Sequence, residues 1–95
     1  MASGTGVAVI DFGLGSNEAQ ANVTGQADIL ATSKAESWVM ADDTTVDHTA
    51  SDHRYFDALT GLTCGTPTPG IGFTIYATSI HKLSGTYQVR FVWAD

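Results

Sequence analysis

The sequence predicts an all-β domain, either an antiparallel β-sandwich or a small barrel of jelly-roll or Ig-like type, with about six to eight short strands. Short runs of β-branched and aromatic residues recur along the chain, and turn residues separate them every ten or so positions. No long stretch repeats apolar residues at the helical spacing, so at most one helical turn is expected. The 95 residues contain no linker or internal repeat, and we expect one domain over residues 1–95.

The clearest strand pattern lies in the last third of the chain, over residues 71–80 and 86–94. In the second run, large apolar side chains alternate with other residues and share one face; they are Tyr87, Val89, Phe91 and Trp93. The five residues between the runs, 81–85, end in glycine and suit a hairpin turn. We therefore expect the hydrophobic core to form around a hairpin of these two strands.

Two further strands are expected near the start of the chain. Residues 5–12 carry apolar side chains on both faces, which favours a position inside a sheet or against a partner. If exposed alone, such a strand would promote aggregation, so a neighbouring copy could cover it by strand addition or domain swapping. Residues 18–24 form a weaker candidate that depends on Val23.

The segment 28–41 is compatible with a helix or a strand. Ser33 and Glu36 match a capping box, which would begin a helix. Only about six residues separate Ser33 from the next break, too few for a stable helix without strong packing. We therefore favour a strand, with Trp38 and Met40 on one face.

The middle of the chain is expected to be a polar loop over residues 42–53, followed by a return to β structure. One helical turn could form over Ala50–Arg54, with Thr49 as its N-cap. Residues 55–66 resume a β pattern. The connector 65–70 contains two prolines and a glycine at each end, so it cannot continue a strand.

Composition excludes several functions. The net charge is −6, and only four lysine and arginine residues stand against ten carboxylates. Nucleic acids require clustered cations, so binding to them is not expected, nor is binding to an anionic membrane surface. The one cysteine, Cys64, allows no internal disulfide and no thiolate metal cluster.

Residues 7–17 resemble the first phosphate loop of actin-like ATPases and half-match the dinucleotide-binding motif G-x-G-x-x-G. The position of the third glycine is occupied by Glu18. Nucleotide sites of both kinds need a following helix whose N-terminus faces the phosphates, and no amphipathic helix follows Asn17. We interpret the stretch as a strand and a turn.

The polar loop contains the only candidate metal ligands of note, which are Asp47, His48, Asp52 and His53. The spacing fits neither an EF-hand loop nor the H-E-x-x-H helix. A solvated loop whose Asp and Thr side chains bond their own backbone is the favoured interpretation. The alternative is a loop that binds a cation or lies at a subunit contact. We expect no catalytic residues, no cofactor and no metal.

Other candidate chemistry is weaker. Cys64 paired with a histidine could act as a nucleophile, but a lone cysteine on an apolar strand is usually a small core residue. The adjacent Asp42 and Asp43 do not define a separated acid and base for glycoside hydrolysis. Four aromatic side chains could line a sugar site, but their alternation favours core packing, with Tyr76 the one that could face outward; they are Trp38, Tyr76, Tyr87 and Trp93.

Taken together, four stretches resemble the small β-rich virion structural proteins of tailed bacteriophages. These stretches are residues 5–13, 41–53, 70–77 and 92–95. The resemblance implies a non-enzymatic structural role, as a capsid decoration subunit that packs on a protein lattice or assembles with itself, or as a small tail or fibre component; the first is favoured. The implied partners are other virion proteins and further copies of the chain, and the implied location is the virion, after synthesis in the host cytoplasm.

Two alternatives of other classes remain open. One is a carbohydrate- or receptor-binding module of a phage tail or fibre, which would use exposed aromatic side chains and the loop 42–53. The other is a small metal-dependent enzyme built on His48 and His53.

Overall fold

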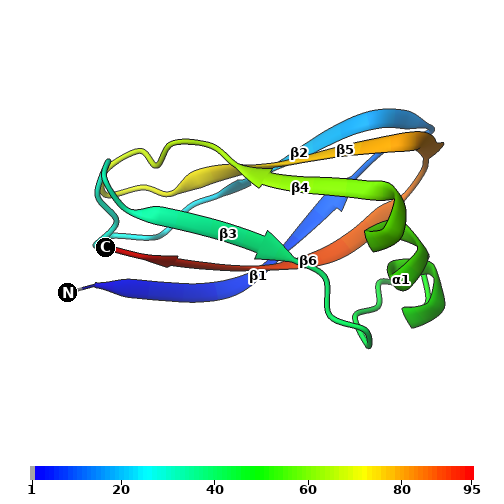
Figure 1. The fold of residues 1–95 in the computed structure, drawn as a ribbon, viewed down its shortest axis with the longest axis horizontal. Coiled ribbons are helices and arrows are strands. Elements are labelled where there is room, and N and C mark those ends of the chain that lie inside the picture. Colours follow the sequence, from blue (N-terminus) through cyan, green and yellow to red (C-terminus); the bar gives the residue numbers. More distant parts are fainter. Residues whose placement is uncertain (1) are drawn as a thin grey trace.

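The computed structural model describes residues 2–95 as two three-stranded antiparallel sheets packed face to face, with one helix at one end (Figure 1). The first sheet has the order β1–β6–β3, and the second has the order β2–β5–β4. The strands are β1 (Ser3–Asp11), β2 (Ser16–Val23), β3 (Lys34–Trp38), β4 (Thr60–Cys64), β5 (Phe73–Leu83) and β6 (Thr86–Ala94), and the helix is α1 (Ala50–Leu59). The predicted all-β sandwich is confirmed.

The two strands of the last third are the middle strands of the two sheets, and the core forms between them, as expected. Each strand buries alternate side chains, because a middle strand has one face against the opposite sheet. The core residues are Ile10, Phe12, Val23, Ile29, Phe56, Phe73, Ile75, Ala77, Tyr87, Val89, Phe91 and Trp93.

The predicted hairpin of these strands is wrong. β5 continues to Leu83, the connection shrinks to Ser84 and Gly85, and the chain then crosses into the other sheet. Gly85 makes this crossing with a φ of 77° and donates its N–H to the Gly13 carbonyl at 2.9 Å. The strands therefore face each other across the core instead of sharing a ladder of hydrogen bonds.

β1 lies at the edge of its sheet and pairs only with β6 among the described strands, so the expected interior position is wrong. Its inward face is built of the small residues Gly4, Gly6 and Ala8, followed by the buried Ile10. A Cβ atom on Gly6 would lie 2.7 Å from the Phe91 ring, and one on Gly4 would overlap the Trp93 indole. Glycine is therefore needed where these two large rings pack beneath the strand.

β3 confirms the strand that was favoured over a helix in residues 28–41. Trp38 and Met40 do share a face, but it is the outer one, and Trp38 is 39% exposed. Core packing was therefore the wrong expectation for Trp38 and the right one for Tyr87 and Trp93, which are buried. Tyr76 lies on the outer face of β5.

The helix α1 is longer than the single turn expected over Ala50–Arg54, and strand structure resumes only at Thr60 instead of residue 55. Thr49 is the N-cap, as predicted, and it forms a capping box with Asp52. His53 and Phe56, three residues apart, both face the core. Packing of these two side chains, more than helix propensity, stabilises the ten-residue helix.

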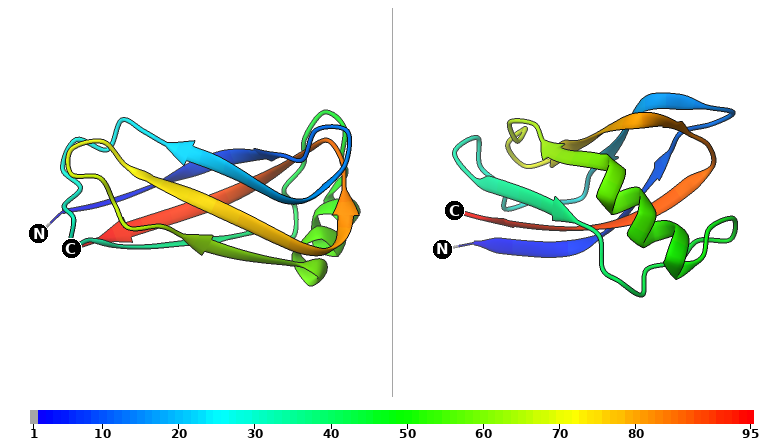
Figure 2. Two further views of the ribbon diagram at one scale, coloured as in Figure 1. Left: turned by 90° about the horizontal axis from the view of Figure 1, so that it is seen from above. Right: turned by 45° about the vertical axis from the view of Figure 1, so that its right-hand side comes forward.

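α1 lies at the end of the sandwich opposite the C-terminus, as Figures 1 and 2 show. The loop from β3 reaches α1 at this end, close to the crossing between β5 and β6. Within residues 2–95, no helix is long and apolar enough to cross a membrane.

Candidate functional site

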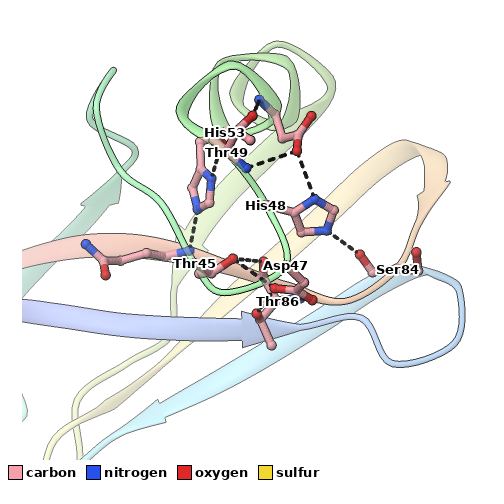
Figure 3. A network of polar contacts seen from close by, with 9 residues as sticks. Thr45, Asp47, His48, Thr49, His53, Ser84 and Thr86 are labelled. Atoms are coloured by element: carbon pink, nitrogen blue, oxygen red, sulfur yellow. Dashed lines mark hydrogen bonds and ion pairs between the residues drawn. The ribbon is translucent and has the colours of Figure 1, made fainter.

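The stretch 42–53, which holds the candidate metal ligands, is a loop only up to Thr49, and its last four residues form the first turn of α1. The loop part packs against the start of β6 (Figure 3). Thr45 fixes the middle of the loop by donating its hydroxyl to the Thr86 carbonyl at 2.8 Å. The four candidate ligands can therefore be judged by what each already binds.

Asp47 accepts hydrogen bonds on both carboxylate oxygens. Oδ2 accepts the Thr86 N–H at 2.9 Å, and Oδ1 accepts the Thr86 hydroxyl and lies 2.9 Å from the Thr45 hydroxyl, whose one proton it shares with the Thr86 carbonyl. The hydroxyl and N–H of Thr86 hold the pKa of Asp47 far below its ordinary value. This carboxylate closes the loop onto β6, in place of the self-contained, solvated loop predicted from the sequence.

His48 stacks on Tyr87 with ring centroids 4.0 Å apart. Its Nε2 lies 2.8 Å from the Ser84 carbonyl, which can only accept, so this nitrogen carries a proton. Its Nδ1 lies 3.4 Å from Asp52 Oδ2. That same Asp52 oxygen accepts the Thr49 N–H at 3.0 Å, which lowers the pKa of Asp52. His48 and Asp52 are neighbours, but their polar atoms are engaged in holding the helix start and the crossing turn.

His53 is fully buried, with both ring nitrogens bonded to backbone groups. Nδ1 donates to the Thr49 carbonyl at 2.9 Å, and Nε2 accepts the Gln88 N–H at 2.8 Å. These partners fix the neutral ring with its proton on Nδ1. No lone pair of the ring is free, so His53 cannot ligate a metal or act as a base without breaking a structural bond.

The structure thus disperses the four candidate ligands among separate bonds. Among residues 2–95, no three His, Cys, Asp or Glu side chains gather in a geometry that could hold a metal ion. In the same described part of the chain, no hydrogen bond joins Cys64 to a histidine, and the ring nitrogens of His48 and His53 are bonded to other residues. Burial, and the charge of Glu36, raise the pKa of the Cys64 thiol, so it is a poor nucleophile.

The segment between β1 and β2 forms a turn, as predicted from the sequence. Asp11 Oδ1 accepts the Gly13 N–H at 2.7 Å, and Gly13 adopts a φ of 62°. β2 follows directly, so no helix N-terminus faces the glycines where a phosphate would have to bind.

Sequence reasoning missed one buried charged pair. Asp43 is 2% exposed, and its Oδ1 accepts from Arg90 Nε at 3.0 Å, from Arg90 Nη2 at 2.8 Å and from the Gln88 amide at 3.0 Å. Its Oδ2 accepts the Met40 N–H at 2.9 Å. Burial acts to raise the pKa of Asp43, but the bonds from Arg90 and Met40 outweigh it, and the pKa lies below its ordinary value. The adjacent Asp42 is exposed.

This pair lies beside an apolar area on the outer face of the β1–β6–β3 sheet. Val7 and Trp38 both stand opposite Arg90, one on each neighbouring strand. We call the exposed apolar side chains of this face the outer patch; they are Val7, Val9, Trp38, Met40 and Val92. With its charge held by Asp43, Arg90 contributes its aliphatic stem to the same surface.

The opposite outer face is more polar. Tyr76 is its exposed aromatic side chain, and it stands opposite Gln20 on β2 and Thr63 on β4. The two faces therefore differ: one offers apolar side chains on three strands, and the other offers Tyr76 and Ile80 on the middle strand alone.

No family model matches this chain, and comparisons with curated proteins and with solved structures found no match.

Proposed function

We propose that the chain is a non-enzymatic structural subunit that docks on other proteins of a phage virion through the outer patch of the β1–β6–β3 sheet. The observation that carries the proposal is the patch itself, which places exposed apolar side chains on all three strands of one sheet. Exposed apolar side chains gathered on one face and rimmed by polar residues are typical of a protein–protein contact.

The surroundings of the patch fit docking better than catalysis. Among the polar groups beside it, Asp43, Gln88 and Arg90 are bonded to one another, and Glu36 stands exposed opposite Val92. A preformed pair of this kind lets Arg90 present a fixed, partly neutralised surface to a partner. The histidines and carboxylates of the loop 42–53 are likewise occupied in holding the fold.

The test is whether the chain enters particles and by which face. A tagged chain would be expressed in the strain that carries its gene, and particles would be purified on a gradient. We expect the chain in the particle fraction, and a Trp38→Ser, Val92→Ser variant to be reduced there at least tenfold. Tyr76→Ser is the matched control, because it removes an equally exposed aromatic side chain from the opposite face.

A wild-type chain absent from particles contradicts the structural role. Equal loading of the Trp38→Ser, Val92→Ser variant and the wild type contradicts the assigned face. Capsid or tail genes on either side of the reading frame would add independent support.

A carbohydrate- or receptor-binding role is the second candidate, and Tyr76 is the observation that favours it. An exposed ring between Gln20 and Thr63 offers a sugar an apolar face and two hydrogen-bonding groups. A glycan array with and without calcium tests this role. Binding that Tyr76→Ala abolishes would support it, and absence of binding in both conditions would end it.

A further inference from the structure

The backbone of β1 presents a free hydrogen-bonding edge. At its two ends, the Asp95 N–H bonds the Ala2 carbonyl at 3.1 Å and the Phe12 N–H bonds the Gly85 carbonyl at 2.9 Å. The register between β1 and β6 is continuous, so bonding residues must alternate between these ends. The even-numbered residues of β1 therefore bond to β6. The odd-numbered residues direct their N–H and C=O groups away from the sheet; they are Ser3, Thr5, Val7, Val9 and Asp11.

This edge lacks the devices that usually prevent strand pairing. It is nine residues long, regular in register, and free of proline and of lysine. The other edge strands differ. β2 has an irregularity after Ser16 and carries Glu18, β3 carries Lys34 and Glu36, and β4 has only five residues. β1 is thus the edge on which an added strand would meet the least resistance.

The space beside the edge suits a strand whose inward side chains are small. A groove of about 470 Å³ lies between β1 and β2, lined by Thr5 to Val9 on one side and by Ala21 to Thr24 on the other. β1 itself presents Gly4, Gly6, Ala8 and Ile10 on its inward face, and Ile10 packs in the core of its own chain. Over residues 4–8, a second β1 strand therefore has the small inward side chains that this groove can accept.

We infer that two copies of the chain pair antiparallel through their β1 edges, about a two-fold axis at Val7. In this register Val7 faces its own copy, Thr5 faces Val9, and Ser3 faces Asp11. Each of these residues belongs to the set with free N–H and C=O groups, so the pairing forms about ten backbone hydrogen bonds. The two three-stranded sheets join into one sheet of six strands, and the two outer patches become continuous.

Charge and size agree with a second copy as the occupant. Each chain carries a net charge of −6, but β1 contains one charge, at Asp11. The register keeps the two Asp11 carboxylates about 25 Å apart. A strip about 30 Å long and about 15 Å deep buries on the order of 1,000 Å² in total, near the lower limit for a specific interface. The dimer is therefore expected to dissociate on dilution.

A cysteine scan of the edge tests the register in the full chain. Cys64→Ser removes the native thiol, and single cysteines are then placed at positions 3, 5, 7 and 9. Under a mild oxidant we expect Val7→Cys to form a disulfide-linked dimer at least tenfold faster than the other three, since only position 7 meets itself. Val92→Cys is the control on the same outer face but on the middle strand.

Sedimentation velocity gives an independent readout without added cysteine. The wild type should show a monomer–dimer equilibrium that strengthens as salt rises, because salt screens the repulsion between two acidic copies. Val7→Lys should weaken the dimer at least tenfold by bringing two ammonium groups together at the axis, and circular dichroism would verify that its fold is unchanged. Crosslinking equal at all positions, or a dimer unaffected by Val7→Lys, overturns the pairing.

The β1 pairing rests on the proposed function in naming a second copy as the partner, but the pairing and the docking role can be contradicted separately. A chain that enters particles yet stays monomeric at every concentration removes the β1 pairing and leaves the docking role. A chain that crosslinks through Val7→Cys but never enters particles removes the virion role and leaves the pairing.

Discussion

The Nε2 atom of His53 accepts the backbone N–H of Gln88 at 2.8 Å, which joins the first turn of α1 to the middle strand of the β1–β6–β3 sheet. The other ring nitrogen bonds the Thr49 carbonyl. One buried side chain therefore holds together the loop, the helix and the sheet. His53, which the sequence offers as a candidate metal ligand, therefore has a structural role.

Replacing His53 with phenylalanine should lower the free energy of unfolding by about 2–3 kcal/mol. An aromatic ring is kept, but the Gln88 N–H loses its partner in a buried site, and the Thr49 carbonyl keeps only the backbone N–H of residue 53. Urea denaturation measures the loss. The control is His81→Phe, at an exposed position of β5. A loss below about 0.5 kcal/mol for His53→Phe would contradict the assigned role, since substitutions at uninvolved surface positions already span that range.

The buried Asp43 predicts a pH dependence of stability. Its pKa is lower in the folded chain than the ordinary value of 3.8, so its contribution is complete above that value and is lost as pH falls through the folded pKa. Asp47, Asp52 and Asp95 have lowered pKa values as well and act in the same direction. The free energy of unfolding should therefore decline as pH is lowered below about 4.

The variant Asp43→Asn isolates the contribution of this one carboxyl group to the free energy of unfolding. It should cost about 2 kcal/mol at pH 7, because the Arg90 guanidinium loses its charged partner. The variant should also lose less stability than the wild type between pH 5 and pH 2. Asp42→Asn, at the exposed neighbour, should follow the wild-type curve. Parallel curves for Asp43→Asn and the wild type would show that the ion pair contributes nothing specific.

The sequence was sufficient to predict which side chains of β6 are buried, because period-two alternation depends only on local geometry. It could not predict that β5 and β6 lie in different sheets, since alternation identifies a face and not a partner. Asp42 and Asp43 have nearly the same local sequence, and only the distant Arg90 distinguishes them. For the same reason, the outward direction of Trp38 became evident only from its pairing with Arg90.

Gly6→Ala should destabilise the fold by about 1–3 kcal/mol, because the new methyl group would lie 2.7 Å from the Phe91 ring and force the core to shift. The matched control is Gly61→Ala on β4, where an added Cβ meets nothing within 4 Å. Thermal unfolding of both variants gives the comparison. Equal melting temperatures would mean that β1 does not pack closely on Phe91.

Phe56→Ala tests whether the helix belongs to the core. The Phe56 ring stacks on Tyr87 at 4.3 Å and meets Phe12 edge-on at 6.0 Å, and it is fully buried. Its removal should cost about 3–5 kcal/mol and reduce the helical circular-dichroism signal, since Phe56 and His53 are the two buried side chains of α1. Tyr55→Ala removes the exposed neighbouring ring and should change stability by less than about 0.5 kcal/mol.

If Phe56→Ala does not fold, the milder Phe56→Leu should still fold and lose about 1 kcal/mol, because leucine fills part of the same space. Equal losses for Phe56→Ala and Tyr55→Ala would contradict the packing of α1 against the sandwich. That result would also weaken the role given to His53, since its bond to Gln88 requires the helix to lie where Phe56 holds it.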